Sequence, residues 1–427
     1  MNQLSFSGLT VRRRGLAALC LAVLGVAAGA GAGAAALFGS DRHPGPVATA
    51  RPAKPSTAST TPSAATFATT YALTPTASSG RAELPPVPTP RVLTPTTPQL
   101  DPGNWSSQQL AAVLVMTGAK MSDAAAIEHA VEEGVAGVVL FGPSSPNLAA
   151  TLSKARAVAP SGNPALIASD EEGGQVQRLS SLIYPLPSAE AMGHWSPARI
   201  TETARSYGLR MSALGVSVDL APDTDIAVPG YFIAAEHRSF SDDPRQVGVD
   251  VNAWNDGLKA AGVLGVVKHW PGHGQASDTH VGGSNVPPWS LLQCRDLIPF
   301  EAAFAHHAGV VMVGHLGVPG LTEGSLPASE SPTALRTLRA QAGATVLIVT
   351  DDLSMAAAST TQGITPPQAA VRSLVAGADV AMVCWAPVDE VTAAVARAIN
   401  NGQLPRYQAV ASARRVLQVK MHVVAPR

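Results

Sequence analysis

Short runs of apolar, often β-branched residues alternate with alanine-rich stretches from Asp101 to the end of the chain. A short apolar run followed by a longer amphipathic stretch indicates a buried strand followed by a helix. Eight such runs occupy residues 112–116, 136–141, 165–169, 216–221, 264–269, 310–314, 346–350 and 379–384. The alternation predicts an α/β fold with a parallel sheet, and eight repeats favour a single (β/α)8 TIM barrel. No glycine-rich dinucleotide motif follows the first run, which argues against an open doubly wound sheet.

The first 40 residues lack this alternation and are predicted to direct export. Arg12, Arg13 and Arg14 precede residues 15–39, which contain no charged side chain. A basic segment before an apolar one is typical of a signal peptide or a membrane anchor. The run is long enough to span a bilayer, yet its second half is largely Ala and Gly and offers a small-residue cleavage site. We therefore expect an extracytoplasmic protein, either secreted or anchored to the cell membrane or cell wall by a segment that contacts the membrane.

Residues 41–100 are predicted to be a disordered linker. The segment is rich in Pro, Thr, Ser and Ala and has few large apolar side chains. Such a composition cannot bury enough apolar surface to form a core, so the segment stays extended and solvated. Residues 101–427 are then expected to form the folded catalytic domain, which the linker holds away from the membrane or wall.

Composition narrows the range of partners. Hydrophobic residues make up 46% of the chain, which is enough for a large core. The formal net charge of −1 gives no general field that would concentrate a polyanion, so we expect no nucleic-acid partner. Three widely spaced cysteines are too few for a disulfide framework or a Cys-rich zinc site. A monomer is the default expectation.

Polar residues follow most of the predicted strands at their carboxyl ends, which is where a barrel of this kind carries its active site. These residues are Asp170, Glu172, Asp223, Arg238, Lys268, His269, His273, Asp278, His280, His315, Asp351 and Asp352. An Asp in this position can simply cap the next helix. Capping needs only one aspartate, so it does not explain why Asp351 and Asp352 both occur. A lone histidine such as His315 is more often structural. A purely structural role fits Lys268 less well, because burying a lysine at the end of a strand is energetically costly unless a charge or ligand pairs with it.

The set suits retaining glycoside hydrolysis. That reaction needs a carboxylate to attack the anomeric carbon and a group that first donates and then accepts a proton. Asp351 supplies the carboxylate, with Asp352 as the alternative that local geometry must decide. His280 lies two residues after Asp278, so the carboxylate can fix one ring nitrogen and raise the basicity of the other. The side chains suited to the hydroxyls of a pyranose are Asp170, Arg238, Lys268 and His269.

The chain resembles bacterial β-N-acetylhexosaminidases of glycoside hydrolase family 3, and four spaced motifs carry the likeness. They are Asp-x-Glu-Gly-Gly at 170–174, Arg-Ser-Phe at 238–240, Lys-His-Trp-Pro-Gly-His-Gly at 268–274 with Asp-Thr-His at 278–280, and Thr-Asp-Asp-Leu-Ser-Met at 350–355. The similarity spans residues 108–421, nearly all of the folded part. It implies a single barrel that removes terminal β-linked N-acetylglucosamine, typically from peptidoglycan fragments, with retention and without a metal or other cofactor.

The resemblance also implies a role for each matched residue. Asp351 would be the nucleophile and His280 the acid/base, with Asp278 as its partner on a mobile loop at residues 271–283. The residues that would hold the terminal sugar are Asp170, Arg238, Lys268 and His269, with Arg178 in support. The chain departs from the family pattern at Gln175, at Thr279 and over residues 225–236, so leaving-group preference is less secure than reaction class.

Other functions stay open at this stage. Related family members are β-glucosidases that use a Glu from a second domain, and some relatives with a His acid/base pass the sugar to phosphate. A metal-dependent hydrolase could use His269, His273, His280 and Asp351 as ligands. A non-catalytic cell-wall glycan-binding protein is also conceivable, although a decayed site has no reason to keep Asp351, Asp278 and His280 together.

Overall fold

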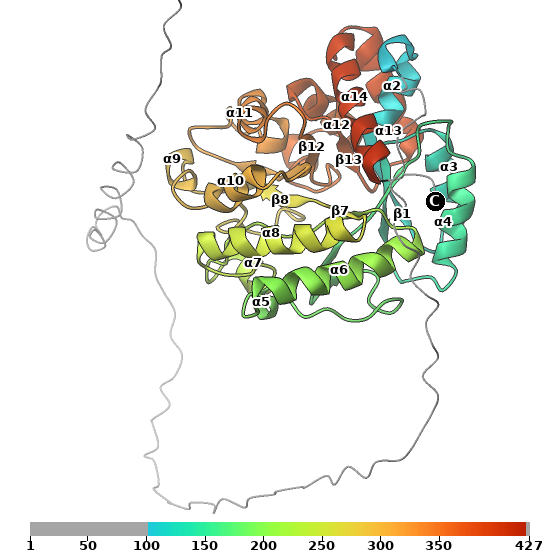
Figure 1. Cartoon of the computed structure of the whole chain (residues 1–427). Coiled ribbons are helices and arrows are strands. Elements are labelled where there is room, and N and C mark those ends of the chain that lie inside the picture. The colour runs from blue at the N-terminus through green and yellow to red at the C-terminus, as the bar shows by residue number, and fades with distance from the viewer. Residues whose placement is uncertain (1–100, 424–427) are drawn as a thin grey trace, which may run out of the picture. The chain divides into compact units, whose positions relative to one another are not determined.

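The computed structural model describes residues 101–423 (Figure 1). The predicted signal or anchor segment at residues 1–40 and the predicted linker at residues 41–100 lie outside the described residues. Both therefore remain predictions, as does the domain boundary at residue 101. Within the part of the chain that is described, no helix combines the length and the apolar character needed to cross a bilayer.

Parallel strands form the centre of the fold. Six of them form one sheet in the order β13, β1, β2, β3, β6, β7, and three form another in the order β12, β10, β8. These strands are β1 (Val115–Lys120), β2 (Gly137–Phe141), β3 (Leu166–Ser169), β6 (Val218–Asp219), β7 (Leu264–Gly265), β8 (Val267–Trp270), β10 (Val310–Val313), β12 (Leu347–Thr350) and β13 (Ala381–Val383). Two small pairs add β4 (Glu171–Gly173) with β5 (Val176–Gln177), which is antiparallel, and β9 (Ser284–Asn285) with β11 (Leu316–Gly317).

Contacts join the two sheets at both ends. β7 and β8 follow one another in the chain with Val266 between them, and Val349 of β12 forms a bridge with Val380 just before β13. The predicted α/β fold with a parallel sheet is thus confirmed, while a closed eight-stranded barrel stays a prediction.

Each of the eight predicted runs overlaps a strand, but the first was placed too early. Residues 112 and 113 belong to helix α2 (Ser107–Val113), and β1 begins at Val115. The reason is a capping box: Ser106 Oγ accepts a hydrogen bond from Gln109 N, and Gln109 Oε1 accepts one from Ser106 N. This cap starts a helix immediately before the apolar residues that we had expected in the strand.

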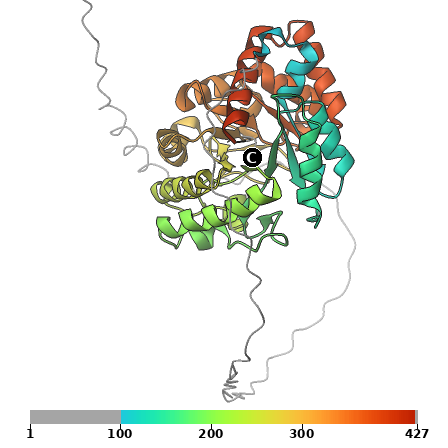
Figure 2. The same cartoon turned by 45° about the vertical axis from the view of Figure 1, so that its right-hand side comes forward.

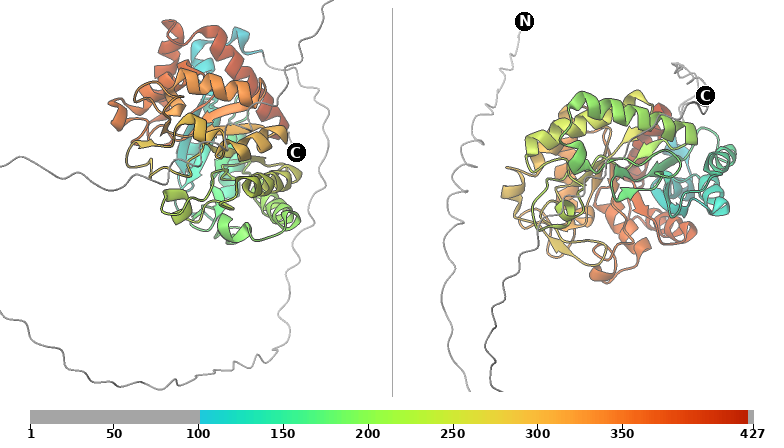
Figure 3. Two further views of the ribbon diagram at one scale, coloured as in Figure 1. Left: turned by 90° about the vertical axis from the view of Figure 1, so that its left-hand side faces the viewer. Right: turned by 90° about the horizontal axis from the view of Figure 1, so that it is seen from below.

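Helices lie on the outside of the strands in every view (Figures 1, 2 and 3). After η1 (Pro102–Asn104) and α2, the chain forms α3 (Ala124–Glu132), α4 (Leu148–Ala157), α5 (Ala189–Met192), α6 (Pro197–Leu214), α7 (Phe232–Ala235), α8 (Pro244–Ala260), α9 (Trp289–Leu292), α10 (Leu297–Ala305), η2 (Ala328–Glu330), α11 (Pro332–Ala342), η3 (Thr360–Gln362), α12 (Pro366–Ala376), α13 (Val388–Asn400) and α14 (Arg406–Val423). The first and last of the longer helices, α2 and α14, contact one another, so the two ends of the described chain meet (Figure 1).

The core is divided between the two faces of the strands. In β10, Val311 and Val313 belong to one buried cluster, which also contains side chains of α6, α8 and α10. Val310 and Met312 belong to the other cluster, and β2, β3 and β12 divide their residues between the two clusters in the same alternating way. This period of two is the alternation expected of a strand that is buried on both faces. It explains why the strands are almost wholly apolar up to their carboxyl ends, where the polar residues begin.

Candidate active site

A cavity of about 360 Å³ collects the polar residues that follow the strands. Seven of the eight predicted site residues line it: Asp170, Arg178, Arg238, Lys268, His269, His280 and Asp351. The eighth, Asp278, contacts His280. Glu172, which belongs to the first motif, also lines the cavity. Lining residues that the sequence did not indicate include Val139, Phe141, Phe232, Met312, Cys384 and Trp385.

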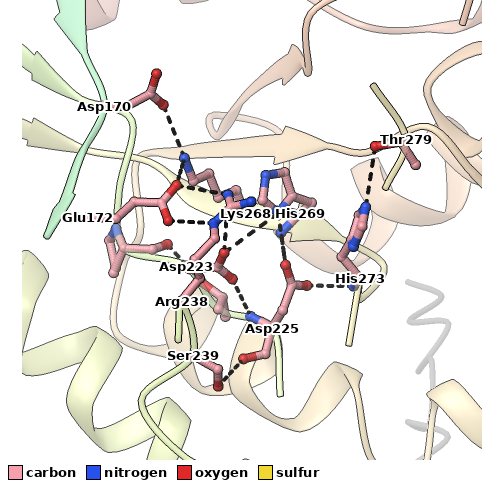
Figure 4. Close-up of polar contacts among 12 residues, drawn as sticks. Asp170, Glu172, Asp223, Asp225, Arg238, Ser239, Lys268, His269, His273 and Thr279 are labelled. Carbon is pink, nitrogen blue, oxygen red and sulfur yellow. Dashed lines mark hydrogen bonds and ion pairs between the residues drawn. The ribbon is translucent and has the colours of Figure 1, made fainter. Parts of the chain in front are cut away.

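Glu172 is the centre of a buried ion-pair cluster on one wall of the cavity (Figure 4). Its Oε1 lies 2.5 Å from Lys268 Nζ, and its Oε2 lies 2.7 Å from Arg238 Nε. Asp170 Oδ1 lies 3.2 Å from Lys268 Nζ, and Asp170 Oδ2 lies 3.7 Å from Arg178 Nη2. The expectation that Lys268 needs a charged partner is confirmed.

The charges in this cluster stabilise one another. Burial by itself would raise the pKa of Glu172, but Arg238 and Lys268 outweigh it and lower the pKa to about 2. Burial would likewise lower the pKa of Lys268, yet the carboxylates of Glu172 and Asp170 hold it above its usual value. Glu172 and Lys268 are therefore both ionised at neutral pH. The result is a rigid wall of alternating donors and acceptors suited to a sugar with many hydroxyls.

A short hairpin places Glu172 and Asp170. β4 ends at Gly173, and Gly174 and Gln175 join it to β5. The φ angles of Gly173 and Gly174 are 89° and 59°, a region that glycine adopts at little cost. A Cβ on Gly173 would lie 2.1 Å from the carbonyl oxygen of Pro187, so only glycine fits. The Gly-Gly pair in the sequence motif is thus a backbone requirement of the hairpin.

Glu171 anchors the same hairpin from the opposite side. Its carboxylate accepts hydrogen bonds from Ser169 Oγ at 2.6 Å, from Tyr207 Oη at 2.7 Å and from the backbone N–H of Leu179 at 3.1 Å. Burial raises the pKa of Glu171 to about 7. The anchoring role of Glu171 could not be predicted from the sequence, because its hydrogen-bond donors come from other parts of the chain.

Asp225 holds the two histidines of the Lys-His-Trp-Pro-Gly-His-Gly segment. Its Oδ2 accepts hydrogen bonds from the backbone N–H of His269 at 3.2 Å and lies 2.8 Å from His269 Nδ1. Its Oδ1 accepts one from the backbone N–H of His273 at 2.6 Å. Burial raises the pKa of Asp225 to about 6 and lowers that of His273 to about 3. Asp225 lies in the segment that follows β6, so that segment positions the site rather than merely bordering it.

The two adjacent aspartates have different surroundings. Asp352 Oδ1 accepts hydrogen bonds from the backbone N–H groups of Ser354 and Cys384, each at 2.9 Å. Asp351 accepts one from the backbone N–H of Asp352 at 2.8 Å. Burial would raise the pKa of Asp351, but His269, His315, that N–H group and Lys268 together hold it below its usual value. By contrast, burial raises the pKa of Asp352. Asp351 is the carboxylate that the site keeps ionised.

His315 supports the loop that carries this pair. Its Nε2 donates a hydrogen bond to the carbonyl oxygen of Asp352 at 2.9 Å, and its Nδ1 lies 2.8 Å from Ser329 Oγ. Burial lowers the pKa of His315. The structural role that we considered for this lone histidine agrees with these contacts.

Asp278 and His280 form a pair at the open end of the cavity. His280 Nδ1 lies 2.6 Å from Asp278 Oδ1, which also accepts a hydrogen bond from the backbone N–H of His280. The side chain of His280 is 63% exposed. The loop is fastened to the segment after β12, because Ala356 N donates to the carbonyl oxygen of His280 at 3.3 Å. The pair therefore lies at an exposed part of the cavity lining, and its loop contacts the segment that follows Asp351.

Two groups in the part of the chain that the structure describes bring possible metal-ligand atoms within 4.8 Å of one another. They are His129, Glu133 and Asp389 at the surface, and Asp223, Asp225 and His269 beside the cavity. Neither group is the set of ligands considered for a metal-dependent hydrolase, which was His269, His273, His280 and Asp351. In the second group, the Oδ2 of Asp225 already contacts two nitrogens of His269.

Parallel strands with an active-site cavity at their carboxyl ends, ionised carboxylates and an adjacent Asp–His pair define a hydrolase that acts on glycosides. The chain belongs to glycosyl hydrolase family 3, since residues 107–419 match the family's N-terminal domain. The predicted family is thereby confirmed.

Several proteins similar to this chain are named beta-hexosaminidase or β-N-acetylglucosaminidase. A protein of Mycobacterium tuberculosis named beta-hexosaminidase LpqI is 37% identical over 363 residues, covering 81% of this chain and 92% of that protein. A beta-hexosaminidase of Xanthomonas euvesicatoria is 35% identical over 287 residues, covering 64% of this chain and 84% of that protein. Among solved structures, a family 3 glycosyl hydrolase of Mycobacterium smegmatis has a TM-score of 0.69 at 35% identity, covering 75% of this chain and 98% of that one. A family 3 β-N-acetylglucosaminidase from Paenibacillus sp. has a TM-score of 0.69 at 29% identity, covering 74% of this chain and 62% of that one.

Proposed function

We propose that this family 3 hydrolase is a retaining β-N-acetylglucosaminidase that removes terminal β-linked N-acetylglucosamine from peptidoglycan-derived fragments. One observation carries the proposal. The ionised carboxylate of Asp351 and the Asp278–His280 pair line or overhang a single cavity, whose wall is the ion-pair cluster around Glu172. The names of the relatives support the N-acetylhexosaminidase assignment.

In the first step, the carboxylate of Asp351 attacks the anomeric carbon of the terminal sugar. The bond between that carbon and the leaving oxygen breaks, and Nε2 of protonated His280 gives its proton to the oxygen. Asp278 holds the other ring nitrogen at 2.6 Å and stabilises the charged imidazole. The leaving group departs, and the sugar remains as an ester of Asp351.

In the second step, neutral His280 removes a proton from water, and the water oxygen attacks the same carbon. The ester bond to Asp351 breaks and the carboxylate is restored. Two displacements at one carbon return it to its original configuration. Since His280 acts in both steps, its exposure at the entrance is consistent with exchange of the leaving group for water.

Asp351 is the better nucleophile of the two aspartates on these contacts. Two backbone N–H groups donate to Oδ1 of Asp352 and fix the orientation of its carboxylate. Burial raises the pKa of Asp352, whereas the pKa of Asp351 is held below its usual value. Asp352 is then a structural residue that connects the loop after β12 to the end of β13.

The terminal sugar is held by the ion-pair cluster around Glu172. Lys268 and Arg238 are donors, Asp170 is an acceptor, and Asp225 fixes the ring of His269 beside them. Arg178 supports Asp170 from the rim. Buried charged donors and acceptors that are already paired need little reorganisation when hydroxyls bind, which lowers the entropic cost of binding.

The location and architecture are further parts of the proposal. The basic residues before the apolar stretch at residues 15–39 support export, as a cleaved signal or as an anchor, and export would bring the enzyme to cell-wall fragments. The bridge between Val349 and Val380 and the succession of β7 and β8 support a closed (β/α)8 barrel.

Hydrolysis of aryl β-N-acetylglucosaminide beside aryl β-glucoside by the full-length protein tests the activity, with and without a chelator. We expect release from the N-acetyl substrate alone, at the same rate with the chelator present. Added phosphate should neither accelerate release nor yield sugar 1-phosphate. Release from the glucoside alone, or from neither substrate, would contradict the proposal.

A further inference from the structure

The cavity has a buried end and an exposed end. At the buried end the side chains of Lys268 and Glu172 are only 3% and 2% exposed. His280 lines the same cavity and is 63% exposed, which marks the exposed end. If the sugar hydroxyls bind the buried cluster and His280 protonates the leaving oxygen, the leaving group lies at the exposed end.

An exposed aromatic residue also lines this cavity. Trp385 lines the cavity and is 65% exposed, the largest exposure of any aromatic residue that lines it. Its ring contacts Phe141, with the ring centroids 4.3 Å apart and the planes tilted by 47°. The backbone N–H of Trp385 donates to Ser354 Oγ at 3.1 Å, so the residue is tied to the loop that begins at Asp351.

A glycine in the strand between Phe141 and Trp385 leaves the space that the close approach of the two sides requires. Phe141 ends β2 and Trp385 follows β13, and β1 lies between these two strands. A Cβ on Gly118 of β1 would lie 2.6 Å from the ring of Phe141 and 2.8 Å from the Cα of Cys384. Any larger residue at position 118 would push the two sides apart. The pair is therefore a built feature of the rim rather than an accidental surface contact.

We infer that Trp385, supported by Phe141, is a platform for the leaving saccharide, the sugar unit attached to C1 of the terminal residue. This inference rests on the proposed function and deepens it. A pyranose has an apolar face of C–H groups, which packs against the negatively polarised face of an aromatic ring. The platform binds the second sugar through that face, so it selects saccharide leaving groups over small ones.

The experiment compares two substrates of the full-length protein. One is the β-1,4-linked disaccharide of N-acetylglucosamine, which places a sugar on the platform. The other is N-acetyl-β-glucosaminyl fluoride, whose leaving group is too small to reach it. Trp385→Ala should lower kcat/KM for the disaccharide about 10-fold more than for the fluoride, mainly through KM. Trp385→Phe keeps an aromatic ring and should recover most of the loss.

Tyr407→Ala is the matched control, because Tyr407 is 79% exposed on α14 and does not line the cavity. Its kcat/KM values should equal those of the wild type for both substrates. Equal losses on the two substrates for Trp385→Ala would show that Trp385 contacts the terminal sugar and would overturn the inference. No loss on either substrate would overturn it as well. Failure of the wild-type protein to hydrolyse either substrate would instead refute the proposed function, and the inference with it.

Discussion

Removing the charge of Glu172 is the perturbation whose effect can be worked out most fully. Glu172→Gln keeps the shape of the side chain but leaves Lys268 and Arg238 as buried cations, each having lost its nearest carboxylate. The lowering of the Glu172 pKa from 4.5 to about 2 corresponds to about 3 kcal/mol of stabilisation. Breaking a buried ion pair by removing one partner typically costs about 3 to 5 kcal/mol, in agreement with this figure.

The sign of the pH dependence follows from the lowered pKa. A carboxylate with a lower pKa in the folded state contributes its full stability above 4.5, and this contribution is lost as the pH falls towards 2. Glu172→Gln should therefore be less stable than the wild type by about 3 kcal/mol at pH 7. The gap should narrow below pH 4.5.

Urea unfolding followed by tryptophan fluorescence at several pH values measures this gap. Glu202→Gln is the control, because Glu202 is in an exposed ion pair with Arg205 that solvent screens. The control should unfold like the wild type at every pH. A Glu172→Gln variant that matches the wild type at pH 7, or whose deficit does not change on acidification, would refute the reasoning.

Further predictions concern the other carboxylates of the site. Asp351→Asn should abolish turnover, while Asp352→Asn should keep a measurable kcat; steady-state kinetics that show the reverse would contradict the assignment. Asp278→Asn should lower kcat about 100-fold with little change in KM, since it removes the partner of the acid/base; a change in KM alone would argue for a binding role. Because burial raises the pKa of Glu171 from 4.5 to about 7, the wild type loses stability as the pH rises between these values, and Glu171→Gln should flatten that slope in thermal unfolding.

The sequence predicted the strand positions and the motif residues well because both depend on local pattern. Seven of eight site residues line one cavity, since they lie at the ends of the parallel strands or in the loops between them, and these strands end at the same edge. The expectation that Lys268 needs a charged partner followed from its burial alone. The identity of that partner, Glu172, could not be predicted, because the hairpin turn at Gly173 and Gly174 decides which carboxylate faces the lysine.

Two other residues escaped prediction for related reasons. Asp225 lies outside the four sequence motifs, and only the folded chain shows that it holds His269. Trp385 follows a strand like the motif residues, but an aromatic residue is equally common in a core, and its exposure is a property of the fold. The first strand was misplaced because the cap at Ser106 extends a helix into an apolar run.

The most direct test of the account is to trap the glycosyl-enzyme. A 5-fluoro derivative of N-acetyl-β-glucosaminyl fluoride slows both displacements but retains a good leaving group for the first, so the intermediate accumulates. After proteolysis, mass spectrometry locates the added sugar. The account predicts one N-acetylglucosaminyl derivative on Asp351 and none in Asp351→Asn. A label on Asp352, or complete turnover with no covalent species and an inverted product, would contradict it.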